Sequence, residues 1–141
     1  MNIKNIFVAL AVLVIATSCK KDDNDGDGSV ELDLLIGTWN LDRETDNDGF
    51  DETYDSSCNN FWEFTEDTLR AVWDYDCDGA IDDDSTASYR LDGNEILPLN
   101  GPNPDDTRAF IRTLTNSNLR IELETPEGEG FVYKENFYFS R

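Results

Sequence analysis

The sequence predicts an all-β protein, an eight-stranded antiparallel up-and-down barrel, with a β-sandwich as the alternative. After residue 29 apolar and polar residues mostly alternate, which is the pattern of half-buried strands. Short, turn-rich links separate eight such segments and favour sequential antiparallel neighbours. The same region holds every aromatic residue except Phe7, out of 3 Trp, 5 Tyr and 8 Phe, enough to build a core. Closure of such a meander into a barrel removes its exposed edges.

The N-terminal segment has the layout of a secretion signal. Lys4 precedes eleven unbroken apolar residues at 6–16, and small residues lead into Cys19. Because a spanning helix needs about 20 apolar residues, we expect residues 1–18 to be a cleaved signal peptide and not a membrane anchor. The segment resembles the signal of a bacterial lipoprotein, which implies that Cys19 becomes the first mature residue and carries diacylglycerol and acyl chains such as palmitate. An ordinary signal peptide, with Cys19 as a bystander, is the alternative.

The residues after Cys19 predict where the protein is located. In lipoproteins of this type an aspartate after the lipidated cysteine marks retention at the inner membrane, and here the residue is Lys20. The resemblance therefore implies the outer membrane, and the lysine-then-acid run at 20–23 resembles the export tags of lipoproteins displayed on the cell surface. No apolar side chain follows before the domain, so 19–29 are expected to be a disordered acidic tether that leads from the lipid to a single domain at 30–141.

Within that domain the elements follow in order. Leucines in 30–35 predict a short helical turn packed against one end of the domain. The run 36–43 predicts the first strand, with Trp39 and Leu41 on one face. The further strands are expected at 60–65, 68–75, 85–91, 95–99, 108–115, 119–125 and 131–139. The links at 65–67, 92–94, 116–118 and 127–130 contain residues that tolerate tight turns.

Charge and composition exclude several functions. The chain has 31 acidic and 11 basic residues and a net charge of −20, which disfavours nucleic acid and other anionic partners. It contains no histidine, so it lacks the commonest general base and the usual protease triads. We therefore expect a protein that is not an enzyme.

Two terminal motifs carry a resemblance to a known family. The run Ile36-Gly37-Thr38-Trp39, after a short turn, resembles the opening motif of lipocalins. The final run from Phe137 to Arg141 is similar to the closing strand. Residues 30–141 thus resemble the lipocalin-like domain of bacterial cell-surface lipoproteins. The resemblance implies that Trp39 plugs one barrel end beside Gly37 and that Arg141 lies across its indole, and it implies a fold without a single activity.

The remaining cysteines are expected to pair. With Cys19 lipidated, Cys58 and Cys77 are left in an oxidising compartment, where a disulfide is the default. Sequences of this type also carry a cysteine before the second strand. Metal ligation and free thiols are the alternatives.

Acidic residues at 74–82 have the spacing of a calcium-binding loop. The acids stand at positions one, three, five and nine and are Asp74, Asp76, Asp78 and Asp82. Gly79 would let the chain wrap, and the Ala80 carbonyl could add one of the about six to eight oxygens that Ca²⁺ takes. Ser85 replaces the glutamate that completes an EF-hand, so the expected affinity is modest, about 10⁻⁴ to 10⁻³ M. Turn dipeptides with solvated aspartates are the alternative.

A looser version of this spacing occurs near residue 49. Its acids are Glu44, Asp46, Asp48 and Glu52. It is a weaker candidate for calcium, and plain turn chemistry at Asp48-Gly49 is again the alternative. No organic cofactor is expected.

The barrel interior is the other candidate site. A barrel of eight strands is either filled by side chains or just wide enough for one small ligand, and with strands this short we expect much of it to be filled. The aromatic residues expected to line it are Trp62, Phe64, Trp73, Tyr89, Phe110 and Tyr133.

The leading hypothesis is a non-enzymatic, lipid-anchored surface protein that acts as a binding or structural module, stabilised by a disulfide and by calcium. Its expected partner is the membrane, through Cys19; no protein partner can be named. The alternatives are a carrier of a small hydrophobic ligand inside the barrel and, further off, a carbohydrate-active accessory enzyme or inhibitor.

Overall fold

The computed structural model describes residues 29–99 and 106–141, so the expected signal peptide, Cys19 and most of the tether lie outside the described residues. One helix and nine strands make up the described chain: α1 Leu32–Leu35, β1 Gly37–Asp46, β2 Asp51–Thr53, β3 Phe61–Phe64, β4 Thr68–Trp73, β5 Asp83–Asp92, β6 Glu95–Pro98, β7 Arg108–Leu114, β8 Asn118–Gly128 and β9 Phe131–Ser140. No helix in these ranges is long and apolar enough to cross a membrane.

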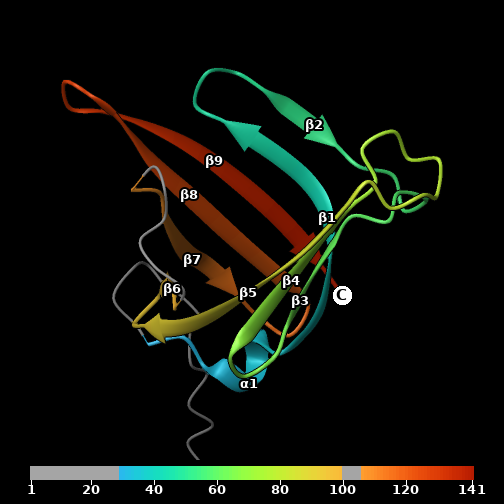
Figure 1. Ribbon diagram of the computed structural model, residues 1–141, viewed down its shortest axis with the longest axis horizontal. Helices are drawn as coiled ribbons and strands as arrows, with labels where there is room; N and C mark the ends of the chain where they lie inside the picture. Colours follow the sequence, from blue (N-terminus) through green and yellow to red (C-terminus); the bar gives the residue numbers. More distant parts are fainter. Residues whose placement is uncertain (1–28, 100–105) are drawn as a thin grey trace, which may run out of the picture.

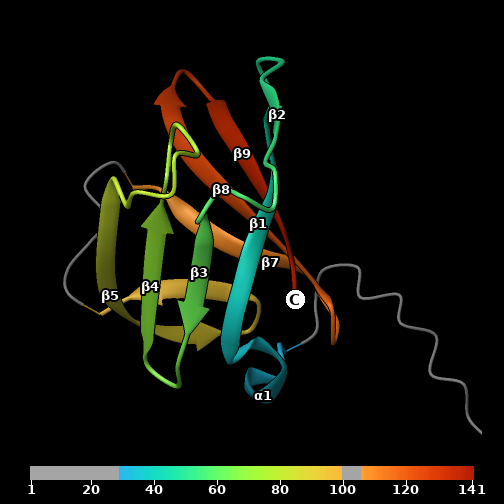
Figure 2. The same cartoon turned by 90° about the vertical axis from the view of Figure 1, so that its right-hand side faces the viewer.

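Eight of the strands form a closed antiparallel barrel (Figures 1 and 2). Sequential neighbours pair from β3 to β9, and β1 closes the ring because it pairs with β3 and also with β9. The barrel confirms the fold expected from the alternation of the sequence and excludes the sandwich, in which β1 and β9 would not be paired.

The ninth strand, β2, was not expected. It pairs with the second half of β1, where Arg43 lies opposite Thr53 and Thr45 opposite Asp51. The hairpin extends beyond the barrel wall (Figure 2). Its three residues are all exposed and polar, so no apolar alternation marks them as a strand.

A bulge in β1 decides which acids face inward. The register of β1 against β9 shifts between Leu41 and Arg43, so Asp42 is an extra residue. Leu41 lies opposite the buried Phe139, and after the bulge Glu44 lies opposite the buried Phe137. Because paired residues of antiparallel strands point to the same face, Glu44 faces the barrel interior.

One end of the barrel is plugged by Trp39 and covered by α1 (Figure 2); we call it the closed end. The Trp39 side chain is fully buried, and its Nε1 donates to the Leu35 carbonyl at 2.8 Å. The Arg141 guanidinium lies 4.1 Å from the Trp39 ring centroid and donates to the carbonyls of Leu34 and Ile36, each at 3.0 Å. This is the arrangement that the family resemblance implied.

Gly37 is required at this point. Its φ of +129° is unfavourable for other residues, and an added Cβ would lie 3.2 Å from Arg141 Nη1. A side chain there would push the guanidinium away from the indole.

Aromatic packing fills the barrel next to the plug. The Trp62 ring centroid lies 5.4 Å from that of Phe137 and 5.1 Å from that of Phe139, and Phe64 meets Tyr89 edge to face at 5.7 Å. All five side chains are buried. The expectation of a filled interior thus fits the half of the barrel at the closed end.

The prediction that Phe110 lines the barrel interior was wrong, because its side chain faces outward. Its neighbours Ala109 and Ile111 belong to the interior core, so the alternation of β7 puts Phe110 on the other face. There it is covered by the guanidinium groups of Arg108 and Arg112, 4.7 and 4.6 Å from the ring centroid. The two stacked arginines thus bury the Phe110 ring on the outer face of the barrel, away from the core.

Candidate functional site

The candidate site is the end of the barrel opposite α1, which we call the open end, because inward-facing side chains there are accessible. On β5 the buried Tyr89 and the half-buried Leu91 belong to the core, so Ser85 and Ala87 face inward by alternation. Both are nevertheless exposed. Solvent therefore reaches the inward face of β5 at these two positions.

Small residues also face inward on β4 and β7. Ala71 on β4 pairs with Ser85, and Ala109 on β7 also faces the core; both are half-buried. The bulky inward side chains stand on β3, β4 and β9, where Trp62 contacts Phe137 and the Trp73 ring lies 6.2 Å from Phe137. The interior thus combines aromatic side chains on β3, β4 and β9 with small side chains on β4, β5 and β7.

The expected lumen residues are distributed along the whole barrel axis. Trp62, Phe64 and Tyr89 are buried inside, and Trp73 is half-buried at the open end, with Tyr75 stacked on it at 6.0 Å. Tyr133 lies at the rim, where its hydroxyl donates to Asp46 Oδ2 at 2.7 Å.

Two half-buried carboxylates face inward at the open end. Glu44 lies opposite Phe137, and Glu135 lies opposite Leu123 of the core and Asp46. Burial raises the pKa of the Glu44 carboxyl and that of Glu135, and the nearby charge of Asp46 raises both further.

Two tyrosine hydroxyls donate hydrogen bonds to acids at the open end, Tyr54 to Glu44 and Tyr133 to Asp46. The Tyr54 hydroxyl donates to Glu44 Oε2 at 3.0 Å; burial is the main cause that raises the pKa of Tyr54, followed by the charge of Glu44. The hydrogen bond from Tyr133 lowers the pKa of Asp46 and raises that of Tyr133. No ion pair within the described ranges involves Glu44 or Glu135.

The acids of the looser calcium spacing near residue 49 therefore have other roles in the structure. Glu44 and Glu52 are paired across β1 and β2, while Asp46 Oδ1 accepts the backbone N–H groups of Asp48 and Phe50 and shapes the hairpin turn. In the part of the chain that the structure describes, these four acids do not form a group that could hold a metal ion.

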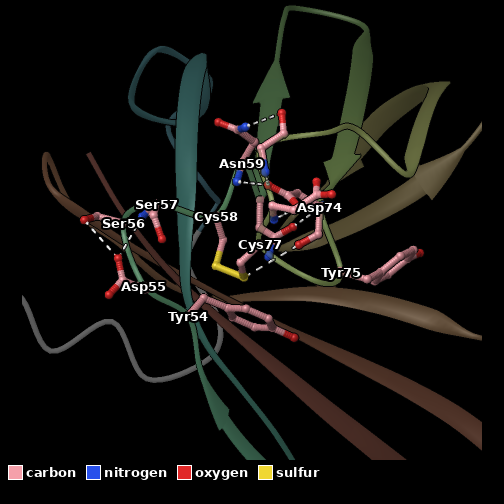
Figure 3. The surroundings of a disulfide bond; sticks show 12 residues. Tyr54, Asp55, Ser56, Ser57, Cys58, Asn59, Asp74, Tyr75 and Cys77 are labelled. Carbon is pink, nitrogen blue, oxygen red and sulfur yellow. Dashed lines mark hydrogen bonds between the residues drawn. A yellow bond between two sulfur atoms is a disulfide. The ribbon is translucent and has the colours of Figure 1, made fainter.

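Cys58 and Cys77 form the expected disulfide, with Cα atoms 4.3 Å apart (Figure 3). It joins the segment before β3 to the loop between β4 and β5. Closing a loop of this length contributes about 3 kcal/mol to stability in the chain-entropy model. Tyr54 is among the residues that surround the bond (Figure 3).

Asp74 organises the loop beyond the disulfide. It is fully buried, and its carboxylate accepts the backbone N–H groups of Asn59, Asp78 and Gly79 at 3.2, 3.1 and 3.1 Å (Figure 3). Asp82 Oδ2 accepts the N–H of Tyr75 at 2.8 Å, so this acid also holds the loop. Asp78 Oδ1 accepts the N–H of Ala80 at 2.7 Å, so three of the four acids predicted as calcium ligands have structural partners.

Three acids of the loop nevertheless come together. Carboxylate oxygens of Asp74, Asp76 and Asp78 lie within 4.8 Å of one another, the only such group of three in residues 29–99 and 106–141. Asp76 and Asp78 are exposed. The chain can therefore present several hard oxygens at one point, as the spacing of the sequence predicted, beside an aspartate already held by amides.

Sequence reasoning missed the residues that give the open end its character. Glu135 and Tyr54 carried no motif, and Ala71, Ala87 and Ala109 are small residues that attract no attention in a strand. The alternation of β9 and β5 could have placed Glu135 and Ala87 on the interior face, because each is an even number of residues from a core aromatic, Phe137 and Tyr89.

Comparisons with known proteins agree with this architecture. A family model described as a lipocalin-like domain matches residues 35–121. The solved structure of an uncharacterized protein from Bacteroides eggerthii is 16% identical and matches 75% of this chain and 98% of that chain, with a TM-score of 0.50. A bovine lipocalin allergen, Bos d 2, is 12% identical and matches 79% of this chain and 75% of that chain, with a TM-score of 0.51. At these identities the two structures show likeness of fold alone. A comparison with curated proteins gave no match.

We predict that Glu44→Gln and Glu135→Gln stabilise the protein at pH 7 and not at pH 4. Because the folded-state pKa of each acid lies above its ordinary value of 4.5, the native state binds more protons in that window, and stability falls as pH rises through it. Removing either charge should raise the free energy of unfolding at pH 7 by up to about 1 kcal/mol, since the groups are partly solvated. Urea unfolding at both pH values measures this.

Glu95→Gln is the control with the opposite sign. Arg108 lowers the pKa of Glu95, so its stabilising contribution is present at pH 7 and is lost on acidification. Destabilisation at pH 7 by Glu44→Gln and Glu135→Gln would contradict the assignment of these two acids as buried without a counter-ion.

Proposed function

Because the chain belongs to the lipocalin-like domain family, we propose that it is a non-enzymatic binding protein that holds a small hydrophobic molecule in the open end of its barrel. Proteins of this fold family are generally binding proteins that do not catalyse reactions. The observation that carries the proposal is the exposure of Ser85 and Ala87, which face inward next to an aromatic wall. Eight strands enclose an interior that side chains can fill or that can hold one small ligand, and accessible inward positions favour the second case.

The shape and chemistry of the open end suit a ligand of modest size. Trp73 and Phe137 offer ring faces and edges, and the inward alanines of β4, β5 and β7 add little bulk beside apolar groups of a ligand. The closed end is filled by Trp39 and its neighbours, so the ligand occupies only the half of the barrel farther from α1.

The described large apolar side chains that are exposed support entry from this end. They are Phe50, Tyr75, Ile81, Leu99, Phe131 and Val132. Phe50 lies in the β1–β2 turn, Tyr75 and Ile81 lie in the β4–β5 loop, and Phe131 and Val132 begin β9, all at the open end, whereas Leu99 directly follows β6. An apolar molecule approaching the barrel therefore meets apolar side chains there first.

We expect Ala87→Trp to block binding. An indole at this inward position would occupy the accessible space and lower affinity for a neutral hydrophobic probe at least about tenfold, equivalent to about 1.4 kcal/mol. Fluorescence titration with N-phenyl-1-naphthylamine measures it. Thr86→Trp is the matched control, because Thr86 is exposed on the outer face of the same strand. Equal binding by both variants, or no saturable binding by the wild-type protein, would refute the proposal.

We also propose that the Asp74 loop binds calcium weakly and thereby stabilises the open end. The support is the convergence of oxygens from Asp74, Asp76 and Asp78, to which the Ala80 carbonyl could add another. Calcium there would neutralise repulsion between the acids of the loop, which also carries the disulfide.

The calcium proposal predicts a concentration-dependent rise in melting temperature. At about 5 mM CaCl₂ and a Kd near 10⁻³ M, binding would stabilise the protein by about 1 kcal/mol, a shift of a few degrees. Asp76→Ala should abolish the shift, because Asp76 is exposed and has no other structural task in the loop. Asp92→Ala removes an exposed aspartate at the closed end and should keep it. A flat wild-type titration would reject calcium binding.

Finally, we propose that the protein is a lipoprotein of the outer membrane, displayed at the cell surface and anchored through Cys19. The support is the signal-like segment 1–18 and the acidic tether after it. Mass spectrometry of the mature protein should find an acylated cysteine at its N-terminus. Cys19→Ser should move the protein from the detergent phase to the aqueous phase, whereas Cys58→Ser should not. An unmodified N-terminal cysteine would exclude the anchor.

A further inference from the structure

The Cys58–Cys77 disulfide joins two loops and no strand of the barrel. Cys58 belongs to the segment between β2 and β3, and Cys77 belongs to the loop 74–82 between β4 and β5. Both cysteines are half-buried, and they stand beside exposed residues such as Ser57 and Asp76. A reductant in solution can therefore reach the bond while the barrel is folded.

The same two segments hold the carboxylate of Asp74. Asn59, which directly follows Cys58, donates its backbone N–H to Asp74 Oδ2 at 3.2 Å (Figure 3). Asp78, which directly follows Cys77, donates its backbone N–H to Asp74 Oδ1 at 3.1 Å. Because Asp74 is fully buried, its place in the fold depends on such donors. The disulfide thus keeps the amides of both segments on one carboxylate.

Charge within the loop opposes this arrangement. The loop 74–82 contains four aspartates and no basic residue. Carboxylate oxygens of Asp74, Asp76 and Asp78 lie within 4.8 Å of one another, and like charges at such a distance repel. No ion pair within the described ranges involves any of these three acids. Opening of the loop would relieve the repulsion, so the covalent bond holds the loop closed against it.

The backbone of Cys77 also depends on the bond. Its φ of +56° lies in the left-handed region, which is unfavourable for a residue other than glycine. A residue keeps such a conformation only where its surroundings fix it. Cys77 is fixed by the disulfide and by a long hydrogen bond, 3.4 Å from its N–H to the Asp74 carbonyl. Without the disulfide Cys77 can return to an ordinary conformation, which again favours an open loop.

Contacts that do not involve the disulfide limit how far an opening can spread. β4 is paired with β5 along its whole length, from Thr68 to Trp73. At the base of the loop Asp82 donates its N–H to the Trp73 carbonyl at 2.8 Å, and Leu41 of β1 donates to the Asn60 carbonyl at 2.9 Å. The barrel wall on both sides is therefore held by its own hydrogen bonds, and only the loop and the segment before β3 depend on the disulfide.

We propose that the Cys58–Cys77 disulfide is a redox latch at the open end: its reduction releases the loop 74–82 while the barrel stays folded. A dithiol supplies two electrons and two protons; the S–S bond breaks, two cysteine thiols form, and the dithiol closes to a cyclic disulfide. The released loop carries Tyr75, whose ring stacks on Trp73 at 6.0 Å, so the latch also changes the aromatic surroundings of Trp73. Only the consequence of this change for a ligand rests on the proposed function.

Amide hydrogen exchange measured by NMR, with and without dithiothreitol, tests the latch. The full chain carrying Cys19→Ser leaves Cys58 and Cys77 as its only cysteines, and EDTA excludes bound metal. After reduction, the three backbone amides that bind Asp74 should exchange at least about tenfold faster, because their exchange reports local opening of the loop. Amides of the paired strands β1 and β9 should stay protected.

The double substitution Cys58→Ser and Cys77→Ser should reproduce the fast exchange without dithiothreitol and should not respond to it. In the reduced protein Asp76→Asn should slow the exchange, because it removes one of the repelling charges, whereas Asp92→Asn changes an exposed aspartate at the closed end and should have no effect. Unchanged exchange of the three amides after reduction, or a bond that dithiothreitol reduces only in urea, would overturn the proposal. Loss of protection throughout the barrel would also overturn it, because the disulfide would then be required by the whole fold.

Discussion

The fold depends on the contact between Trp39 and Arg141. Trp39 stands at the start of the first strand and Arg141 directly follows the last, so this contact joins the two ends of the barrel sheet. The indole binds the α1 backbone at Leu35, and the guanidinium binds the carbonyls of Leu34 and Ile36 on the same segment. One buried ring thus fixes helix, first strand and last strand together. It seals one end so that the opposite end can remain accessible without loss of the core.

The barrel consequently has two halves with different roles. Near the plug, the buried rings of Trp62, Phe64, Tyr89 and Phe139 pack against one another, and this close packing stabilises the fold. Beyond them, small residues replace large ones on β5 and β7, and acids replace apolar residues on β1 and β9. The disulfide and the amide contacts of Asp74 hold the loops of this second half, which has less apolar contact to stabilise it.

Strand positions could be predicted from the sequence because alternation and turn residues are local signals. The closed-end motif could also be predicted, since Gly37, Trp39 and Arg141 lie in the two terminal runs that resemble the opening motif and the closing strand of lipocalins. Phe110 could not be placed, because Ala109, Phe110 and Ile111 are apolar in succession and do not alternate; its place was decided by arginines stacked from the same strand. Nor could the role of Glu44 be predicted, because it depends on a bulge, and its acid spacing instead suggested a metal. Asp74 was predicted as a calcium ligand, which stays a prediction; its carboxylate accepts backbone amides, and no spacing rule reveals such contacts.

The bulge at Asp42 also bears on how such a protein changes over evolutionary time. Because the side-chain period of a strand is two, the bulge sets which residues beyond it face inward, while Trp39 and Leu41 stay in place. If substitutions straightened the bulge so that Asp42 paired with Tyr138, Glu44 and Asp46 would turn to solvent, and Arg43 and Thr45 would enter the barrel. Deletion of Asp42 itself would instead restore regular alternation and keep Glu44 and Asp46 inside. Lineages that share this scaffold can thus change the charge of the interior by losing the bulge at constant strand length, without disturbing the hydrophobic plug.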